Sequence, residues 1–328
     1  MKRIKQLRIT KEDFDAINEF NKSIFKEFLD NSRELSPYTK AHYTSSLRLW
    51  FTWVKNNLDN KKHIEIKPRE FMLFQNWMID RGCSAGDIGC KRIAISSLNN
   101  YILTFYYDEF PLFRNFITKA IKCPPIIPVN EKNPLTKEEF NHLLEVLEEW
   151  GEWQKIAYLK FTFDTGCRRS ESRQVLKEII NAKPITKEKD GKKFIYYETH
   201  KIRCKGRGSI GKIRTFAFSQ PTMDALRKWI DNRGIDNCEY MFITKRVGKI
   251  QQLHPDCFNY WCQFIFSKIV QKRVHPHLLR SSRATTLSEE DGVDIKVIQK
   301  LLGHEDVSTT QRYIIRDDSE DLLELYAN

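Results

Sequence analysis

Apolar and aromatic residues recur at helical spacing from about residue 11 to residue 120. A stripe that begins near Thr10 and Asp13, either of which can cap a helix, predicts the first helix. A Ser-Pro start at Ser36 predicts a second helix, and stripes around Phe71 and over Ile88–Phe105 predict a third and a fourth. The positions of the four stripes, which we interpret mainly as core, are Phe14, Ile17, Phe20 and Ile24, then Tyr43, Leu47, Trp50, Phe51 and Val54, then Phe71, Phe74, Trp77 and Met78, and finally Ile93, Ser97 and Tyr101.

Four prolines between positions 124 and 134 interrupt this helical pattern. Because proline fixes φ and lacks a backbone N–H, the stretch predicts a stiff extended linker. Thr136 and Glu139 then form the capping box of a new helix. A chain of 328 residues is long enough for two domains with separate cores. The predicted parts are a helical domain over residues 1–125, a linker over 126–132 and a second domain over 133–328.

The second domain is predicted to be mostly helical with one β interruption. Phe194–Tyr197 and Ile213–Phe218 are rich in aromatic and β-branched residues, and a glycine-rich turn separates them. Residues 183–214 hold 11 Lys and Arg against 3 Asp and Glu, so most of the chain's net charge lies in this hairpin region. A hairpin laid against a phosphate backbone explains that density better than a merely solvated one. The expected fold class is mainly α with a small β-sheet or hairpin, an α+β architecture.

The formal net charge of +12 and the pI of about 9.2 predict a polyanionic partner, and nucleic acid fits best. On charge alone, a basic protein without such a partner is the alternative. A membrane surface fits less well because no long amphipathic helix carries a basic face. No apolar run follows Met1, so neither a signal peptide nor a membrane anchor is expected. The eight cysteines form no C-x-x-C pair, which predicts reduced thiols, a cytoplasmic location and no zinc finger.

Gly206–Lys212 has the spacing of a nucleotide-binding P-loop. Ile213, however, stands where the magnesium-binding Ser or Thr of that loop belongs. Strands are also predicted on both sides of the segment, whereas a P-loop leads from a strand into a helix. We therefore exclude nucleotide hydrolysis.

Three separated segments carry residues suited to phosphate chemistry. In the first, Thr165–Glu171, a glycine precedes Arg168 and Glu171, which lie three positions apart on one helical face. A guanidinium held by a carboxylate can present its planar fork to a phosphate. In the second, a proline predicts a helix start that places His277 in the first turn and Arg280 one turn above it.

The third segment is a predicted amphipathic helix that is capped by Asp294 and ended by Gly303. His304 follows directly, and Tyr313 comes nine residues later. A lone histidine after a helix or a lone tyrosine near the end of a chain is usually structural. Together with two arginines and a second histidine, they indicate a catalytic set.

These segments resemble the motifs of the tyrosine recombinases, also called the phage integrase family. The motifs T-G-x-R-x-x-E, H-x-L-R and L-G-H followed by a tyrosine occur here as Thr165–Glu171, His277–Arg280 and Leu302–Tyr313, in the family's order. The amino-terminal half is similar to the family's helical core-binding domain at Ser36, Thr39, Tyr43, Leu47, Phe51 and Trp53. The resemblance implies a two-domain DNA clamp, a core-binding domain plus a catalytic domain. Without an arm-binding domain ahead of the core, an Xer-like or transposon-type recombinase is expected.

The resemblance also implies the site residues. The catalytic set is Arg168, Lys205, His277, Arg280, His304 and Tyr313, supported by Glu171, with Arg169, Arg207, Lys212 and Arg214 as candidate DNA contacts. Tyr313 is implied as the nucleophile and the two arginines of the set as phosphate clamps. Lys205 best matches the family's hairpin lysine, and Lys201 and Lys212 stay open as alternatives. The chain departs from the family pattern at Arg169 and Ser281, and neither position belongs to the implied catalytic set. Arg169 is a further DNA contact or a surface charge, and both alternatives stay open.

The chemistry of phosphodiester cleavage suits these residues. Two arginines can stabilise the negative charge of a phosphorane-like state without a metal, so no cofactor is expected. A tyrosine hydroxyl with an unperturbed pKa of about 10 needs a base, which His277 can supply while His304 donates to the phosphate. A hairpin lysine can protonate the leaving 5′-oxygen. The phosphotyrosine keeps the bond energy, so a 5′-hydroxyl can reseal the strand without ATP.

The expected partner is a double-stranded DNA target site. The resemblance implies a homotetramer on two duplexes, with a dimer at each site, and the need for an accessory DNA-bending protein stays open. The acidic and apolar tail after Tyr313 could dock on a neighbouring protomer or on its own domain.

Two functions other than recombination are alternatives for this sequence. A type IB topoisomerase shares the chemistry, but the helical amino-terminal domain and the L-G-H motif favour recombination. A DNA-binding regulator without activity would leave the catalytic set unexplained.

Overall fold

The computed structural model describes residues 9–125, 133–189, 191–206, 211–311 and 313–314. The chain is mainly helical with small antiparallel sheets, as predicted, and it separates into two compact units. Unit 1 contains the helices of the first 125 residues, and unit 2 contains the elements from Lys137 onward. The predicted linker over 126–132 lies outside the described residues, so the predicted domain limits stay a prediction.

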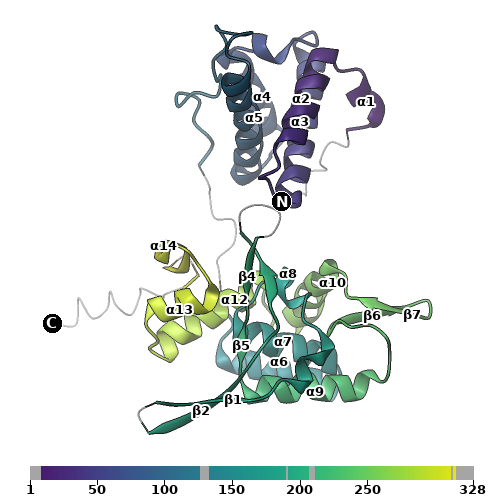
Figure 1. Cartoon of the computed structure of the whole chain (residues 1–328), viewed down its shortest axis with the longest axis vertical. Helices are drawn as coiled ribbons and strands as arrows, with labels where there is room; N and C mark the ends of the chain where they lie inside the picture. The colour runs from purple at the N-terminus through teal and green to yellow at the C-terminus, as the bar shows by residue number, and fades with distance from the viewer. Residues whose placement is uncertain (1–8, 126–132, 190, 207–210, 312, 315–328) are drawn as a thin grey trace, which may run out of the picture. The chain divides into compact units, whose positions relative to one another are not determined.

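Unit 1 is built from helices (Figure 1). They are α1 (Lys11–Asp15), α2 (Glu19–Asn31), α3 (Pro37–Asn57), the short 3-10 helix η1 (His63–Glu65), α4 (Pro68–Asp80) and α5 (Ala85–Phe105). The second, third and fourth predicted helices are confirmed as α3, α4 and α5. Ser36 caps α3 by accepting from the Thr39 amide (3.1 Å), and Pro37 occupies the first helical position.

The first predicted helix is wrong in one respect, because its stripe divides into α1 and α2. Thr10 caps α1 by accepting from the Asp13 amide (3.1 Å). The chain then leaves the helix, and the side-chain oxygen of Asn18 accepts from the Asn21 amide (2.8 Å) to start α2. The side-chain amide of Asn18 also donates to the Asn60 carbonyl (2.5 Å). Asparagine competes for backbone hydrogen bonds in this way, which favours a helix cap over a helix interior.

The core of unit 1 confirms most of the predicted stripes. Their fully buried members include Leu47, Trp50, Phe51, Phe71, Phe74 and Met78. The prediction for α5 is wrong at Ile93, whose side chain is 58% exposed. The buried face of α5 is formed instead by Ile88, Ile95, Leu98 and Ile102.

A buried histidine joins two helices of unit 1. The indole N–H of Trp50 donates to Nδ1 of His63 (3.1 Å), and Nε2 of His63 lies 2.6 Å from Oδ1 of Asn99. Nδ1 therefore accepts, so Nε2 carries the proton and the ring is neutral. Complete burial lowers the pKa of His63 to about 4, although the bond to Asn99 acts in the opposite direction.

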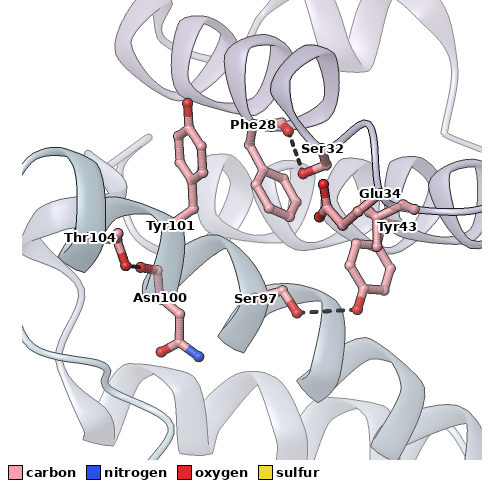
Figure 2. A pocket seen from close by; sticks show the side chains of 9 residues that line it. Phe28, Ser32, Glu34, Tyr43, Ser97, Asn100, Tyr101 and Thr104 are labelled. Carbon is pink, nitrogen blue, oxygen red and sulfur yellow. Dashed lines mark hydrogen bonds between the residues drawn. The ribbon is translucent and has the colours of Figure 1, made fainter. Parts of the chain in front are cut away.

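A hollow of about 310 Å³ is lined by residues of α2, α3 and α5 in unit 1, as Figure 2 shows. The hydroxyls of Tyr43 and Ser97 lie 3.1 Å apart, and the Ser32 hydroxyl donates to the Phe28 carbonyl (2.7 Å). These hydroxyls therefore have partners within unit 1.

In its described residues, unit 2 combines helices with three small antiparallel sheets. Figure 1 shows these elements. Its first elements are α6 (Lys137–Glu149), α7 (Trp153–Thr165), α8 (Arg169–Ser172), η2 (Lys177–Asn181), β1 (Ile185–Lys189), β2 (Lys192–Glu198), β3 (Ile202–Cys204), β4 (Lys212–Arg214), β5 (Ala217–Phe218) and α9 (Gln220–Arg233). The later elements are β6 (Ile243–Arg246), β7 (Lys249–Gln252), α10 (Pro255–Tyr260), the π-helix η3 (Trp261–Phe266), α11 (Ser267–Ile269), α12 (Pro276–Thr285), the π-helix η4 (Thr286–Glu290), α13 (Ile295–Leu302) and α14 (Val307–Gln311).

The two predicted strands pair with each other, but the second divides into β4 and β5, and β3 was not predicted. Strand β2 pairs with β5, and β3 pairs with β4, all antiparallel. The side chain of Thr199 accepts from the Phe216 amide (3.0 Å), and this contact interrupts the ladder between the two pairs. Strand β1, which pairs with β2, was not predicted because its Thr-Lys-Glu-Lys sequence lacks apolar alternation.

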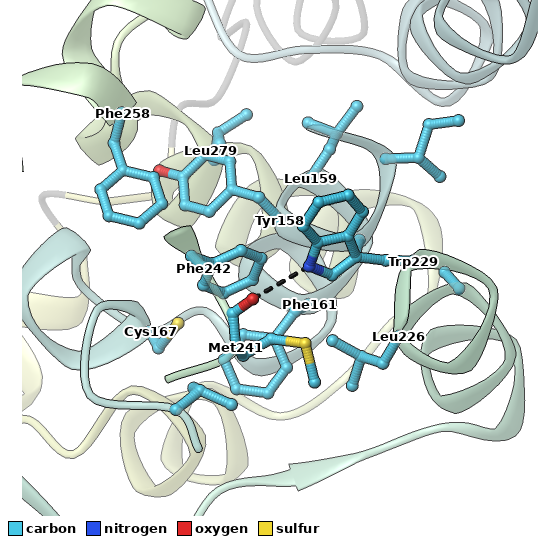
Figure 3. Close-up of a cluster of buried hydrophobic side chains, with 14 of the residues drawn as sticks. Tyr158, Leu159, Phe161, Cys167, Leu226, Trp229, Met241, Phe242, Phe258 and Leu279 are labelled. Carbon is cyan, nitrogen blue, oxygen red and sulfur yellow. Dashed lines mark hydrogen bonds between the residues drawn. The ribbon is translucent and has the colours of Figure 1, made fainter. Parts of the chain in front are cut away.

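The core of unit 2 surrounds α7 (Figure 3). Tyr158 and Phe161 on α7 are fully buried, together with Phe242 and Phe258 from the segments that follow α9. The indole N–H of Trp229 donates to the Met241 carbonyl (2.9 Å), which satisfies the polar group inside this core. Within the described residues, none of the helices combines the length and apolar character needed to cross a membrane.

Candidate active site

Arg168 and Glu171 lie at the sharp junction between α7 and α8. Helix α7 ends at Gly166 in the left-handed conformation (φ +60°), and Arg168 is the N-cap of α8. One carboxylate oxygen of Glu171 accepts from the Arg168 amide (2.6 Å), and the other accepts from its guanidinium (3.0 Å). Glu171 is fully buried, whereas 23% of the Arg168 side chain is exposed. The buried carboxylate therefore fixes a guanidinium that remains accessible.

Arg280 is fully buried on α12. Its guanidinium donates to the carbonyls of Gly166 (2.5 Å) and Leu302 (2.6 Å), and it lies 2.8 Å from Nε2 of His304. Burial and then the positive charge of Arg168 lower the pKa of Arg280 to about 10, so it remains a cation at neutral pH. Through these contacts, Arg280 joins the three motif segments.

His304 is held in one neutral form. Since arginine can only donate, Nε2 of His304 accepts from Arg280, and Nδ1 carries the proton. That proton points to the Thr310 hydroxyl, 2.9 Å away. Desolvation, followed by the charges of Arg280 and Arg168, lowers the pKa of His304 to about 4. In this arrangement Nε2 does not donate, so the predicted bond from His304 to a phosphate requires that Arg280 release Nε2 and that the ring carry its proton on Nε2 instead of Nδ1.

Tyr313 lies between the two histidines. Its hydroxyl oxygen is 2.6 Å from Nε2 of His277, and the rings of His277 and His304 lie 4.9 Å and 4.8 Å from the Tyr313 ring. The guanidinium carbon of Arg280 is 5.4 Å from the Tyr313 ring centre. Five of the predicted site residues from separate segments, with Glu171 behind Arg168, are thus brought together in unit 2.

Lys201, Lys205, Lys212 and Arg214 lie on or beside the β3–β4 hairpin. Lys205 is exposed directly after β3. Lys212 pairs with Glu305, and Arg214 donates to carbonyls at the end of α13. Lys201 is exposed just before β3. Arg207 lies outside the described residues.

Arg169 is the first residue of α8, and its guanidinium is 3.8 Å from the Asp256 carboxylate. A pair at that distance with both partners accessible holds the arginine weakly. The Arg169 side chain is therefore accessible, and its contact with DNA stays a prediction beside the alternative of a surface charge.

Two features of the site were not predicted. Thr310 is fully buried, and it bonds to His304 through its side chain and to the Tyr313 amide through its carbonyl (2.9 Å). Its position one helical turn before Tyr313 is the only signal that the sequence offers. Gly166 meets Leu302: a Cβ at position 166 would lie 2.7 Å from the Leu302 side chain. The first and third motifs therefore touch each other.

Residues 133–320 match the profile of the phage integrase family, which is more than half of the chain. The chain therefore belongs to the phage integrase family, the tyrosine recombinases, and is an enzyme of DNA recombination. Over 98% of its length the chain is 32% identical to the SPbeta prophage-derived recombinase-like protein YomM of Bacillus subtilis (strain 168), and the match covers 96% of that protein.

Two solved structures share the fold. The Tn1549 transposon integrase in complex with transposon right end DNA is similar with a TM-score of 0.66 and 15% identity, over 94% of this chain and 100% of that one. A lambda integrase tetramer bound to a Holliday junction is similar with a TM-score of 0.60 and 16% identity, over 93% and 80% of the two chains.

Proposed function

We propose that the chain is a site-specific DNA recombinase that cleaves and rejoins duplex DNA through a 3′-phosphotyrosine on Tyr313. The observation that carries this proposal is the 2.6 Å contact between the Tyr313 hydroxyl and Nε2 of His277, beside the cation of Arg280. A tyrosine hydroxyl in contact with a base and close to arginines is arranged to attack a phosphodiester.

In the proposed reaction the Tyr313 oxygen attacks the scissile phosphorus, and its proton passes to Nε2 of His277. The 5′-oxygen leaves, and a covalent 3′-phosphotyrosine remains. Arg168 and Arg280 stabilise the charge that develops on the non-bridging oxygens. Once DNA displaces the bond between Arg280 and His304, the ring takes the tautomer with its proton on Nε2, the Thr310 hydroxyl donates to Nδ1, and Nε2 donates to the phosphate. A 5′-hydroxyl from a second strand then attacks the phosphotyrosine and releases the tyrosine. The proposed reaction therefore requires neither ATP nor a metal ion.

A lysine of the β3–β4 hairpin donates the proton to the leaving 5′-oxygen. Lys205 is the first candidate because it follows β3 directly and its side chain is exposed. Lys212 is engaged by Glu305, which makes it the weaker donor, and Lys201 precedes the hairpin.

The proposed substrate is a double-stranded target site, with Arg169, Arg207 and Lys212 as candidate backbone contacts. A tetramer on two duplexes, with a dimer at each site and a Holliday junction as intermediate, is supported by the lambda integrase assembly that shares the fold. The protein is proposed to act in the cytoplasm on a mobile element, consistent with its similarity to a prophage-derived protein.

Covalent trapping tests the proposal. A target duplex is first selected from a random-sequence pool by binding, then nicked and incubated with the protein in EDTA. An SDS-resistant adduct at a 3′-phosphate that is absent in Tyr313→Phe is the expected result. Relaxation of a supercoiled plasmid without the target site would instead indicate a topoisomerase. Binding without any adduct would overturn the proposed activity.

A further inference from the structure

The guanidinium of Arg214 covers the carboxyl-terminal end of α13. One amino group donates to the Leu302 carbonyl (3.0 Å), and the other donates to the carbonyls of Lys300 (3.0 Å) and Leu301 (2.9 Å). The last carbonyls of a helix have no intrahelical partner and carry partial negative charge, so a cation with several donors suits this position. Arg214 thus links strand β4 to the end of α13.

The turn after α13 leaves room for this side chain. Gly303 has a φ of +68°, and a Cβ at this position would lie 1.9 Å from an amino nitrogen of Arg214. The guanidinium occupies the space that any side chain at position 303 would need. The L-G-H segment therefore requires glycine both for its backbone conformation and for its contact with Arg214.

Two arginines share one carbonyl at this turn. The Leu302 carbonyl accepts from Arg214 (3.0 Å) and also from Arg280 (2.6 Å). His304, two residues later, accepts from the same amino group of Arg280. A shift of the Leu302 carbonyl would therefore move both the buried arginine and the histidine that face Tyr313.

Lys212, the other cation of β4, also contacts the segment that follows α13. Lys212 pairs with Glu305, one residue after His304. Lys212 and Arg214 lie on the same face of β4, since side chains two apart in a strand point the same way. Hydrogen bonds from Arg214 and the ion pair of Lys212 therefore hold that face of the hairpin against residues 300–305.

We propose that Arg214 is a positioning residue for strand cleavage and not a contact to DNA. It fixes the hairpin that carries Lys205 to the loop that carries His304, so the leaving-group donor and the phosphate pocket are assembled together. This inference rests on the proposed function, and it reassigns Arg214 from the predicted DNA contacts.

The two roles predict different behaviour of the variants Arg214→Met and Arg214→Lys. For a positioning residue, both variants slow covalent adduct formation by about 10- to 100-fold. They leave the affinity for DNA and its salt dependence unchanged. A lysine does not restore the rate, because a single ammonium cannot reproduce the planar fork across three carbonyls. For a phosphate contact, lysine largely restores function, and methionine reduces the salt slope of binding by about one.

Arg227→Met is the matched control. Arg227 on α9 also donates to a backbone carbonyl, that of Ile180 (3.2 and 3.1 Å). The control therefore removes an arginine-to-carbonyl contact outside the site, and its adduct rate should equal that of the wild type. A rate equally reduced in Arg227→Met and Arg214→Met, with equal losses of thermal stability, would overturn the positioning role in favour of a purely structural one.

Gly303→Ala tests the contact from its other side without any need for cleavage. In the wild-type background, an alanine at position 303 has two costs: a clash with the Arg214 guanidinium and an unfavourable positive φ. In the Arg214→Met background, the clash with the guanidinium is absent and only the cost of the positive φ remains. The loss of stability should therefore be smaller in the Arg214→Met background, as measured by urea unfolding. Equal losses of stability in both backgrounds would overturn the contact.

Failure of this inference can be distinguished from failure of the proposed function. If the wild-type protein forms no covalent adduct with DNA, the proposed function is wrong. If both Arg214 variants form the adduct at the wild-type rate, only the positioning role of Arg214 is wrong.

Discussion

The hydroxyl oxygen of Tyr313 lies 2.6 Å from Nε2 of His277, a residue 36 positions earlier in the chain. This contact predicts that His277 accepts the tyrosine proton during attack. His277→Gln keeps a polar side chain of similar reach but removes the base. We expect it to slow adduct formation by about 100- to 10,000-fold, a typical contribution of general acid–base catalysis, with unchanged affinity for DNA. Single-turnover trapping on a nicked site measures the rate, and a wild-type rate would contradict the role.

A substrate with a modified leaving group can identify the lysine that protonates the leaving 5′-oxygen. A thiol has an unperturbed pKa of about 8.5 and leaves without a donated proton, whereas an alkoxide needs one. We expect Lys205→Ala to cleave an ordinary site slowly and to recover near-wild-type rates on a site with a 5′-bridging sulfur. Lys201→Ala and Lys212→Ala serve as matched controls, and selective recovery in either of them would move the assignment to that lysine.

Thr310 should control the tautomer of His304. Thr310→Val keeps the shape of the side chain but removes the acceptor for the Nδ1 proton. The buried N–H then lacks a partner, and the alternative tautomer would lose the bond from Arg280. We expect a fall of about 10-fold or more in the cleavage rate, and Thr310→Ser should restore it. Nitrogen chemical shifts of the His304 ring report the tautomer directly, and an unchanged tautomer in the valine variant would refute this explanation.

Unit 1 should lose stability in mild acid because of His63. The pKa of its ring is about 4 in the folded protein and about 6.5 when unfolded, so the unfolded chain binds the additional proton between these values. The contribution is therefore complete above about pH 6.5 and is lost progressively as the pH falls towards 4, by up to about 3 kcal/mol. Amide hydrogen exchange in α3 measures this local stability. His63→Gln should show a flatter dependence on pH, and an equal slope would exclude His63 as the cause.

The site was largely predictable from the sequence because its motifs are short and have fixed spacing. The family assignment is confirmed, and Arg168, His277, Arg280, His304 and Tyr313 do converge. The role of Thr310 was not predictable because a threonine between His304 and Tyr313 carries no motif of its own. The contact between Gly166 and Leu302 was not predictable because it depends on how distant segments meet.

The fold was predictable where local signals dominate. Ser36-Pro37 and the capping box at Thr136 mark helix starts that the structure confirms. Strand β1 has no apolar alternation, and its pairing with β2 provides the strand character instead. The division between α1 and α2 depends on Asn60, 42 residues away from Asn18, and local periodicity contains no information about such a partner.

The contact between Gly166 and Leu302 sets a limit on how this protein can be engineered. Chimeras that exchange segments with a relative succeed when each crossover leaves packed pairs intact. Here the side chain of Leu302 lies in the space that a Cβ at position 166 would fill, although 136 residues separate the two. Residues 165–171, 212–214, 277–280 and 300–304 should therefore be transferred as a single block.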